Sequence, residues 1–228
     1  MKYINQKNVF LAISSGICVI LLLIRFQISG NFNYRFLIWN LILAWIPLFF
    51  SQYLLYQEQF VKNLKTYIFF FSWLVFFPNA PYIVTDFIHL RPKFGVPLWF
   101  DLLLITSFVW NGLILGFASL IDIHSLLLKV YSVKKSWSII ISILFLSGYG
   151  LYLGRFERLN SWDIVVHPFR LIHHLLANFA DPAVFSKIIG VTFGFGIFLI
   201  FSYLSIYFIS SKYEISHDPK LINNTDEF

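Results

Sequence analysis

The side chains that could do chemistry gather in two short segments, and the first runs from residue 77 to residue 92. It contains the candidate site residues Asn79, Asp86, His89 and Arg91. A carboxylate, an imidazole and a guanidinium this close together could pair with one another, bind an anion or contribute ligands to a metal. Two prolines, in the sequence FPNAP, flank Asn79 and precede the other three groups, and they disfavour a regular helix there.

The second segment follows a glycine-containing apolar run and holds the densest charge in the chain. Its candidate site residues are Arg155, Glu157, Arg158, Asn160, Asp163, His167 and Arg170. Residues 163–180 are predicted to form an amphipathic helix that lies in the membrane interface, interrupted early by Pro168. On that helix His167, Arg170 and His174 would share one face, because they are three and seven residues apart.

Asp101 completes the set of candidates, because an ionisable residue just inside a membrane span is costly unless it is paired. Three interpretations stay open. The charges form a structural ion-pair network between two loops, or surplus arginine binds an anionic lipid head group, or the carboxylates and histidines hold a divalent ion. No HExxH motif or close histidine box supports a metal, so we expect neither a metal nor another cofactor.

The elements that must position these residues are membrane spans. The chain has 228 residues, of which 58% are hydrophobic and 12% are charged, whereas a soluble domain has roughly 25% charged residues. A net charge of +6 in short connections favours membrane lipids as partners, and nothing resembles a nucleic-acid motif. A single cysteine excludes a disulfide framework. We therefore predict an all-α, polytopic transmembrane helical bundle.

About six spans are expected, since a span needs about 20 apolar residues. They cover residues 9–28, 36–56, 62–77, 98–121, 136–153 and 185–210. Residues 1–210 would form one domain, followed by a polar and disordered tail over residues 211–228. Arg25 lies near enough to the end of the first span to reach the interface, and His124 is interpreted as an ordinary loop residue.

The third span is short, with about 16 residues or roughly 24 Å of helix before Pro78. Either the helix stops at the interface and the FPNAP segment lies along it, or the span is broken at membrane depth. We prefer the interfacial turn. In both cases Asn79 is best placed to satisfy carbonyl groups that the prolines leave free.

Glycine spacing marks candidate helix interfaces, because small residues four apart let helix backbones approach. The pairs are Gly112/Gly116, Gly150/Gly154 and Gly190/Gly194. With six spans, both charged segments and Asp101 share one side of the membrane, together with all six arginines. Nine lysines lie on the other side, which also holds the N-terminus. We place the lysine side in the cytoplasm, in a multi-pass protein of the cell membrane.

Three stretches resemble a known family: FPNAPYIVTDFIHL, WNGLILGFASL and GYGLYLGRFERLNSWD. They are similar to bacterial integral membrane proteins known as domain of unknown function 1361, from the second span to the sixth. The resemblance implies a multi-span membrane protein and supplies no activity and no catalytic residues. Binding of an anionic lipid or lipid-linked substrate is the leading hypothesis. A structural or accessory protein, a small transporter and a membrane-embedded hydrolase or transferase are the alternatives. Whether the chain is an enzyme, and its oligomeric state, stay open.

Overall fold

The fold is an all-helical bundle, seen in a computed structural model that describes all residues except 1, 58–62, 93–94, 170–171, 174–180 and 217–228. The elements are α1 (Lys2–Ser29), α2 (Phe36–Tyr56), α3 (Leu64–Phe76), α4 (Asn79–Tyr82), the 3₁₀ helix η1 (Ile83–His89), α5 (Leu98–Val130), α6 (Val133–Phe156), α7 (Asp163–Val166) and α9 (Pro182–Ser216). Six segments are long and apolar enough to cross a membrane, which confirms the predicted number of spans.

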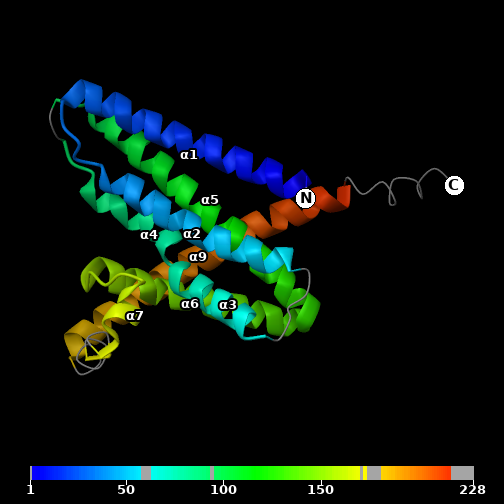
Figure 1. The fold of residues 1–228 in the computed structure, drawn as a ribbon. Coiled ribbons are helices and arrows are strands. Elements are labelled where there is room, and N and C mark those ends of the chain that lie inside the picture. The colour runs from blue at the N-terminus through cyan, green and yellow to red at the C-terminus, as the bar shows by residue number, and fades with distance from the viewer. Residues whose placement is uncertain (1, 58–62, 93–94, 170–171, 174–180, 217–228) are drawn as a thin grey trace.

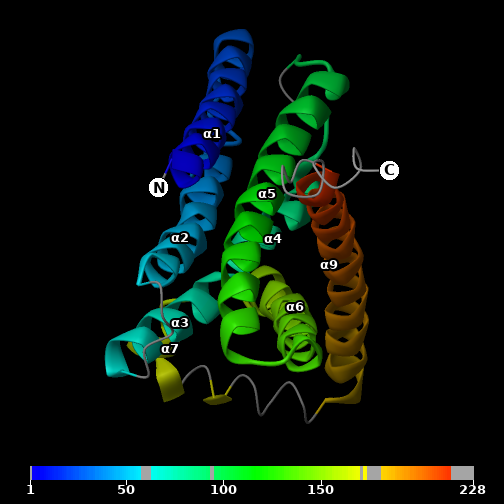
Figure 2. The same ribbon diagram turned by 90° about the vertical axis from the view of Figure 1, so that its right-hand side faces the viewer.

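Helix α5 is the central helix of the bundle. Figure 2 shows α1 and α2 on one side of it and α6 and α9 on the other. About two thirds of its most apolar stretch is buried, more than in any other span of the described chain. Because each span reverses the direction of the one before it, the ends of α1, η1 and α6 lie at one end of the bundle (Figure 1).

The third span is broken inside the protein, so the preferred interfacial turn is wrong. Helix α3 ends at Phe76, and the apolar segment continues through α4 and η1 to His89. Ala80 and Ile83 are fully buried. A 3₁₀ helix rises about 2.0 Å per residue, against about 1.5 Å in an α-helix, which lengthens the short span. The Asn79 amide donates to the Phe76 carbonyl oxygen at 2.9 Å, as expected.

Glycines on two neighbouring helices enclose this broken segment. A Cβ atom on Gly116 of α5 would lie 2.9 Å from that of Ala80, and one on Gly150 of α6 would lie 2.8 Å from that of Pro78. Two of the predicted glycine pairs therefore are close helix interfaces. At Gly190, in the third pair, no described atom outside its own helix lies within 4 Å of the added Cβ position, so this pair forms no such interface in the described structure.

Two other expectations concern the C-terminal side. Helix α9 continues to Ser216, beyond the predicted start of the tail at residue 211, and residues 217–228 lie outside the described residues. Only the start of the predicted interfacial helix is seen, as α7, because most of residues 170–180 also lie outside the described chain. The amphipathic helix therefore stays a prediction.

Candidate functional site

The site is built around an ion pair between Asp86 of η1 and Arg155 near the end of α6. The Arg155 Nη2 atom lies 3.1 Å from Asp86 Oδ1, and the carboxylate is almost fully buried. Asn40 of α2 donates to Asp86 Oδ2 at 2.7 Å, and Arg155 also donates to the Thr85 carbonyl oxygen. Three helical segments therefore converge on one carboxylate whose charge is neutralised.

The Arg155 guanidinium makes further contacts that define its surroundings. Its Nη1 atom lies 3.2 Å from His89 Nε2, which must be the acceptor because arginine can only donate. Its charge lies 5.3 Å from the centre of the Tyr82 ring. Its buried Nε atom has no acceptor among the described residues. A buried donor without a partner is energetically unfavourable, and such exceptions are few in native structures.

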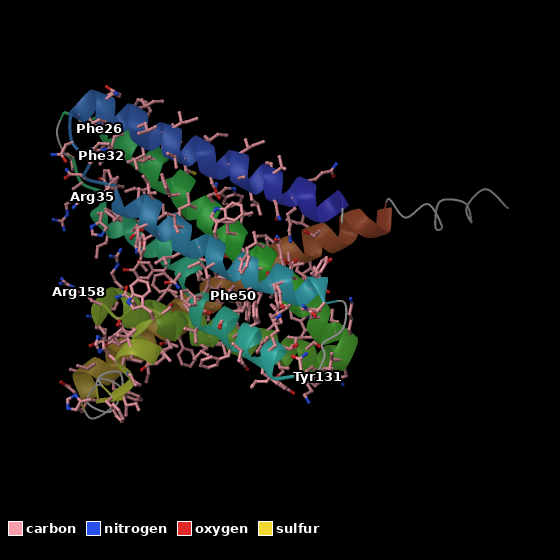
Figure 3. All side chains as sticks on the ribbon, viewed as in Figure 1. Phe26, Phe32, Arg35, Phe50, Tyr131 and Arg158 are labelled. Atoms are coloured by element: carbon pink, nitrogen blue, oxygen red, sulfur yellow. The ribbon has the colours of Figure 1, made fainter. Side chains whose placement is uncertain are left out.

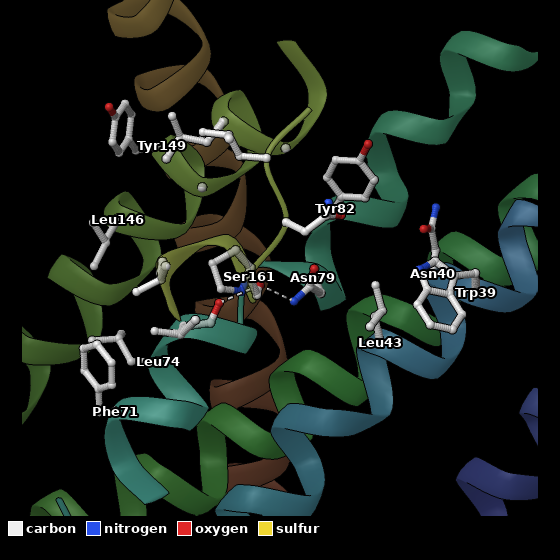
Figure 4. A pocket seen from close by; sticks show the side chains of 18 residues that line it. Trp39, Asn40, Leu43, Phe71, Leu74, Asn79, Tyr82, Leu146, Tyr149 and Ser161 are labelled. Atoms are coloured by element: carbon white, nitrogen blue, oxygen red, sulfur yellow. Dashed lines mark hydrogen bonds between the residues drawn. The ribbon is translucent and has the colours of Figure 1, made fainter. Parts of the chain in front are cut away.

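A hydrogen-bonded chain ties the loop after α6 to the broken span. Asn79 Nδ2 donates to Ser161 Oγ at 2.8 Å, and Ser161 Oγ donates to the Val75 carbonyl oxygen at 2.9 Å. Figure 4 shows these side chains at the centre of a cavity. These two hydrogen bonds position both the loop and the Asn79 amide.

This cavity, which we call the apolar cleft, has a volume of about 420 Å³ and lies between α2, α3, α6 and the loop after α6. Most of its lining is aliphatic or aromatic, with amide and hydroxyl groups among them (Figure 4). The lining residues are Trp39, Asn40, Leu43, Phe71, Leu74, Val75, Pro78, Asn79, Tyr82, Leu146, Tyr149, Gly150, Leu153, Gly154, Leu159, Asn160, Ser161 and Ile164.

A second cavity, the arginine pocket, adjoins the cleft and has a volume of about 510 Å³. It is lined by Tyr82, Ile88, His89, Arg91, Gly154, Arg155, Arg158 and Asn160. Tyr82, Gly154 and Asn160 line both cavities, so the two are adjacent. The loops that follow η1 and α6 therefore meet at one pocket.

The arginines of this pocket differ in their partners. Arg155 is paired with Asp86, whereas Arg91 and Arg158 are exposed and form no ion pair with any described residue. Arg158 has a φ of +56°, which is unfavourable for a residue with a side chain. Figure 3 shows Arg158 at the same end of the bundle as Arg35, with Tyr131 at the other end. Positive charge thus remains available at this end.

Asp101 belongs to a different contact. Its carboxylate accepts from Arg25 Nε at 2.8 Å and Nη2 at 3.2 Å, and both side chains are fully buried. The expectation that Arg25 reaches the interface is wrong, because α5 offers it a two-pronged partner inside the bundle. The Tyr34 hydroxyl lies 3.3 Å from Asp101 Oδ2; burial and then the Asp101 charge raise the pKa of this hydroxyl, so it stays a donor.

The other acidic candidates have structural partners. Glu157 Oε1 accepts from the Tyr152 hydroxyl at 3.0 Å, and Asp163 Oδ2 accepts from the Asn160 backbone N–H at 2.7 Å. His167 is exposed and lines neither cavity. Arg170 lies outside the described residues.

Sequence reasoning missed three residues that the site uses: Asn40, Tyr82 and Ser161. A lone amide inside an apolar span was the available signal for Asn40, since polar side chains there are costly unless they have partners. The interpretation of His124 was also wrong. Helix α5 extends past it to Val130, and the buried His124 ring lies 2.8 Å from the Tyr203 hydroxyl.

The described residues contain no group of three histidine, cysteine or acidic side chains that could hold a metal ion. The fold and this site define a multi-pass, all-α membrane protein with a cleft and an arginine-lined pocket at one end of its bundle. Residues 39–210 match the model of the family described as "Protein of unknown function (DUF1361)", and the chain belongs to this family. No curated protein and no solved structure is significantly similar to the chain. The matched range contains all the residues that line the two cavities, whereas Arg25 precedes this range.

Proposed function

We propose that the chain binds a lipid with an anionic phosphate head group, with a hydrocarbon chain in the apolar cleft and the phosphate in the arginine pocket. The observation that carries this proposal is the junction of the two cavities at Tyr82, Gly154 and Asn160. A lipid phosphate has the same two parts, one apolar and one anionic, joined end to end. Cavities of this size are typical of small-molecule sites.

The charges of the pocket support an anion. Arg155 is already neutralised by Asp86, so Arg91 and Arg158 supply the surplus charge. Arginine presents a planar fork of donors that matches phosphate oxygens in pairs. At the end of the spans these side chains would lie at the level of the head groups, where anionic lipids attract basic residues.

The Arg158 backbone adds support. Left-handed conformations of residues other than glycine cost of order 1–3 kcal/mol, and they cluster at ligand-binding sites. The α6 helix ends just before this residue, and the turn aims the chain toward Asn160 and the pocket.

A structural or accessory role is the rival. It accounts for Arg25 and Arg155, which tie helices together through Asp101 and Asp86. It does not account for two further arginines without acidic partners in the described chain, which line a common pocket beside an apolar cleft. We therefore favour lipid binding. If the N-terminus lies in the cytoplasm, the pocket lies at the other face of the membrane and would bind lipids of the leaflet on that side.

The test is binding of octadecyl phosphate to the purified full chain in detergent. We expect the double variant Arg91→Ala/Arg158→Ala to bind more than about tenfold more weakly, because each lost charge-assisted hydrogen bond is worth about 1.5–3 kcal/mol. Lys134→Ala, an exposed charge at the other end of the bundle, is the matched control and should bind as the native protein does. Equal binding by the double variant and the control would refute the proposal.

A further inference from the structure

We infer that the lipid carries a hydroxyl group close to its phosphate, and that this hydroxyl donates its single proton to the side-chain oxygen of Asn40 or of Asn79. This inference rests on the proposed function, and it narrows the ligand to lipid phosphates with a free hydroxyl next to the phosphate. Both asparagines line the apolar cleft (Figure 4).

The orientation of Asn79 is determined by its partners. Ser161 has one hydroxyl proton, and it donates this proton to the Val75 carbonyl oxygen. Ser161 Oγ must therefore accept from Asn79, so the Nδ2 atom points to it at 2.8 Å. The same Nδ2 atom donates to the Phe76 carbonyl oxygen, which uses both of its protons. The polar atom that Asn79 still offers to a ligand is Oδ1, an acceptor.

The orientation of Asn40 is determined in the same way. Asp86, beside Arg155, is an acceptor, so the Asn40 atom that lies 2.7 Å from it is Nδ2. The Oδ1 atom of Asn40 then lies on the other branch of the amide, as Figure 4 shows. Neither this oxygen nor that of Asn79 accepts a hydrogen bond from any described residue. The cleft therefore offers two fixed acceptors.

Acceptors select against some lipids and in favour of others. The oxygens of a phosphate or an ester are themselves acceptors, so they cannot satisfy these amides. A methylene group would leave both amide oxygens buried without a partner, which is unfavourable. A hydroxyl group, which has one proton, would satisfy one of the two oxygens, and a water molecule could serve the other.

The position of the hydroxyl follows from the same contacts. Asn40 bonds to Asp86, and Asp86 pairs with Arg155 of the arginine pocket. The amide oxygens thus lie near the junction of the cavities, so the hydroxyl belongs one or two carbons from the phosphate. A lipid whose hydroxyls are all esterified lacks this group.

The test compares octadecyl phosphate with 2-hydroxyoctadecyl phosphate, which differ by one hydroxyl, on the full chain in detergent. We expect the hydroxylated probe to bind about three- to tenfold more tightly, the range for one net neutral hydrogen bond. This ratio should fall toward one in Asn40→Leu or in Asn79→Leu, whichever variant removes the acceptor that the hydroxyl uses. Because each ratio is taken within one protein sample, partial misfolding does not change it. Asn40→Leu also leaves the contacts of Asn79 with Ser161 and Phe76 in place.

The outcomes separate the two proposals. If neither probe binds, the proposed function fails and the inference fails with it. If both probes bind equally to the native chain, lipid binding stands and the hydroxyl inference is overturned. A preference for the hydroxyl that survives in both asparagine variants would also overturn it.

Discussion

The Arg155 guanidinium lies 3.1 Å from the Asp86 carboxylate, and this contact joins α6 to the 3₁₀ half of the third span across 69 residues of sequence. Asp86 is buried, whereas Arg155 reaches the edge of the arginine pocket. One residue of the pair is thus a structural anchor, and the other connects that anchor to the candidate site.

Arg155→Leu should strongly destabilise the protein. The variant leaves the Asp86 carboxylate buried with Asn40 as its remaining side-chain donor, and removal of one partner of a buried pair costs about 3–5 kcal/mol. The measurement is unfolding in detergent with increasing sodium dodecyl sulfate. The double variant Asp86→Leu/Arg155→Leu should recover part of the loss, because no charge is left unpaired. A single variant as stable as the double would contradict the structural role of the pair.

Arg158→Gly should make the protein more stable while it weakens lipid binding. Glycine adopts a φ of +56° without the steric penalty, so we expect a gain of about 1 kcal/mol in the same unfolding assay. Arg158→Ala should weaken lipid binding as much as Arg158→Gly does, without the gain in stability. The control is Glu157→Gly, whose φ of −89° suits any residue, and it should gain no stability. A loss of stability in Arg158→Gly would show that the side chain holds the turn.

Gly154→Ala should disturb the site more than Gly190→Ala. A Cβ atom on Gly154 would lie 2.9 Å from the Tyr82 ring, whereas one on Gly190 meets no described atom within 4 Å. Overpacking costs about 1–3 kcal/mol, and alanine in an open helical position gains up to about 1 kcal/mol. The two variants are compared by unfolding in sodium dodecyl sulfate and by their binding of octadecyl phosphate. Equal stabilities would mean that the Tyr82 ring moves freely.

Single-cysteine labelling should place the two charged segments on one side. On a Cys18→Ser background, Arg91→Cys and Arg158→Cys should react with an impermeant thiol reagent from the same side of the membrane, and Lys134→Cys from the other. All three positions are exposed, and the first two line one pocket. Labelling of positions 91 and 134 from the same side would contradict the six-span arrangement.

The number of spans could be predicted because runs of about 20 apolar residues are a strong signal. The break in the third span could not be resolved, since a short run followed by two prolines fits both alternatives. Burial of Ala80 against Gly116 decides between them, and this contact depends on how α5 is rotated about its axis. Rotation of a helix is poorly encoded in hydropathy alone.

The candidate site could also be predicted only in part from the sequence. Counting the spans places both charged segments at one end of the bundle, and the structure has Arg91 and Arg155 in one pocket. Which carboxylate pairs with which arginine could not be predicted, because Asp101 and Asp86 were equally plausible partners. Asn40 was missed because a single amide among apolar residues forms no recognisable motif.

The ion pair between helices far apart in sequence has a consequence for biosynthesis. When the ribosome has completed the first three spans, Asp86 has emerged and Arg155 has not, since 69 residues separate them. An unpaired aspartate costs about 2.5–3.5 kcal/mol at the centre of a span, and less for Asp86, which lies near the end of the span Leu64–His89. Until α6 has been made, the Asp86 carboxylate has the Asn40 amide of α2 as its side-chain donor among the described residues, and the ion pair with Arg155 closes after that.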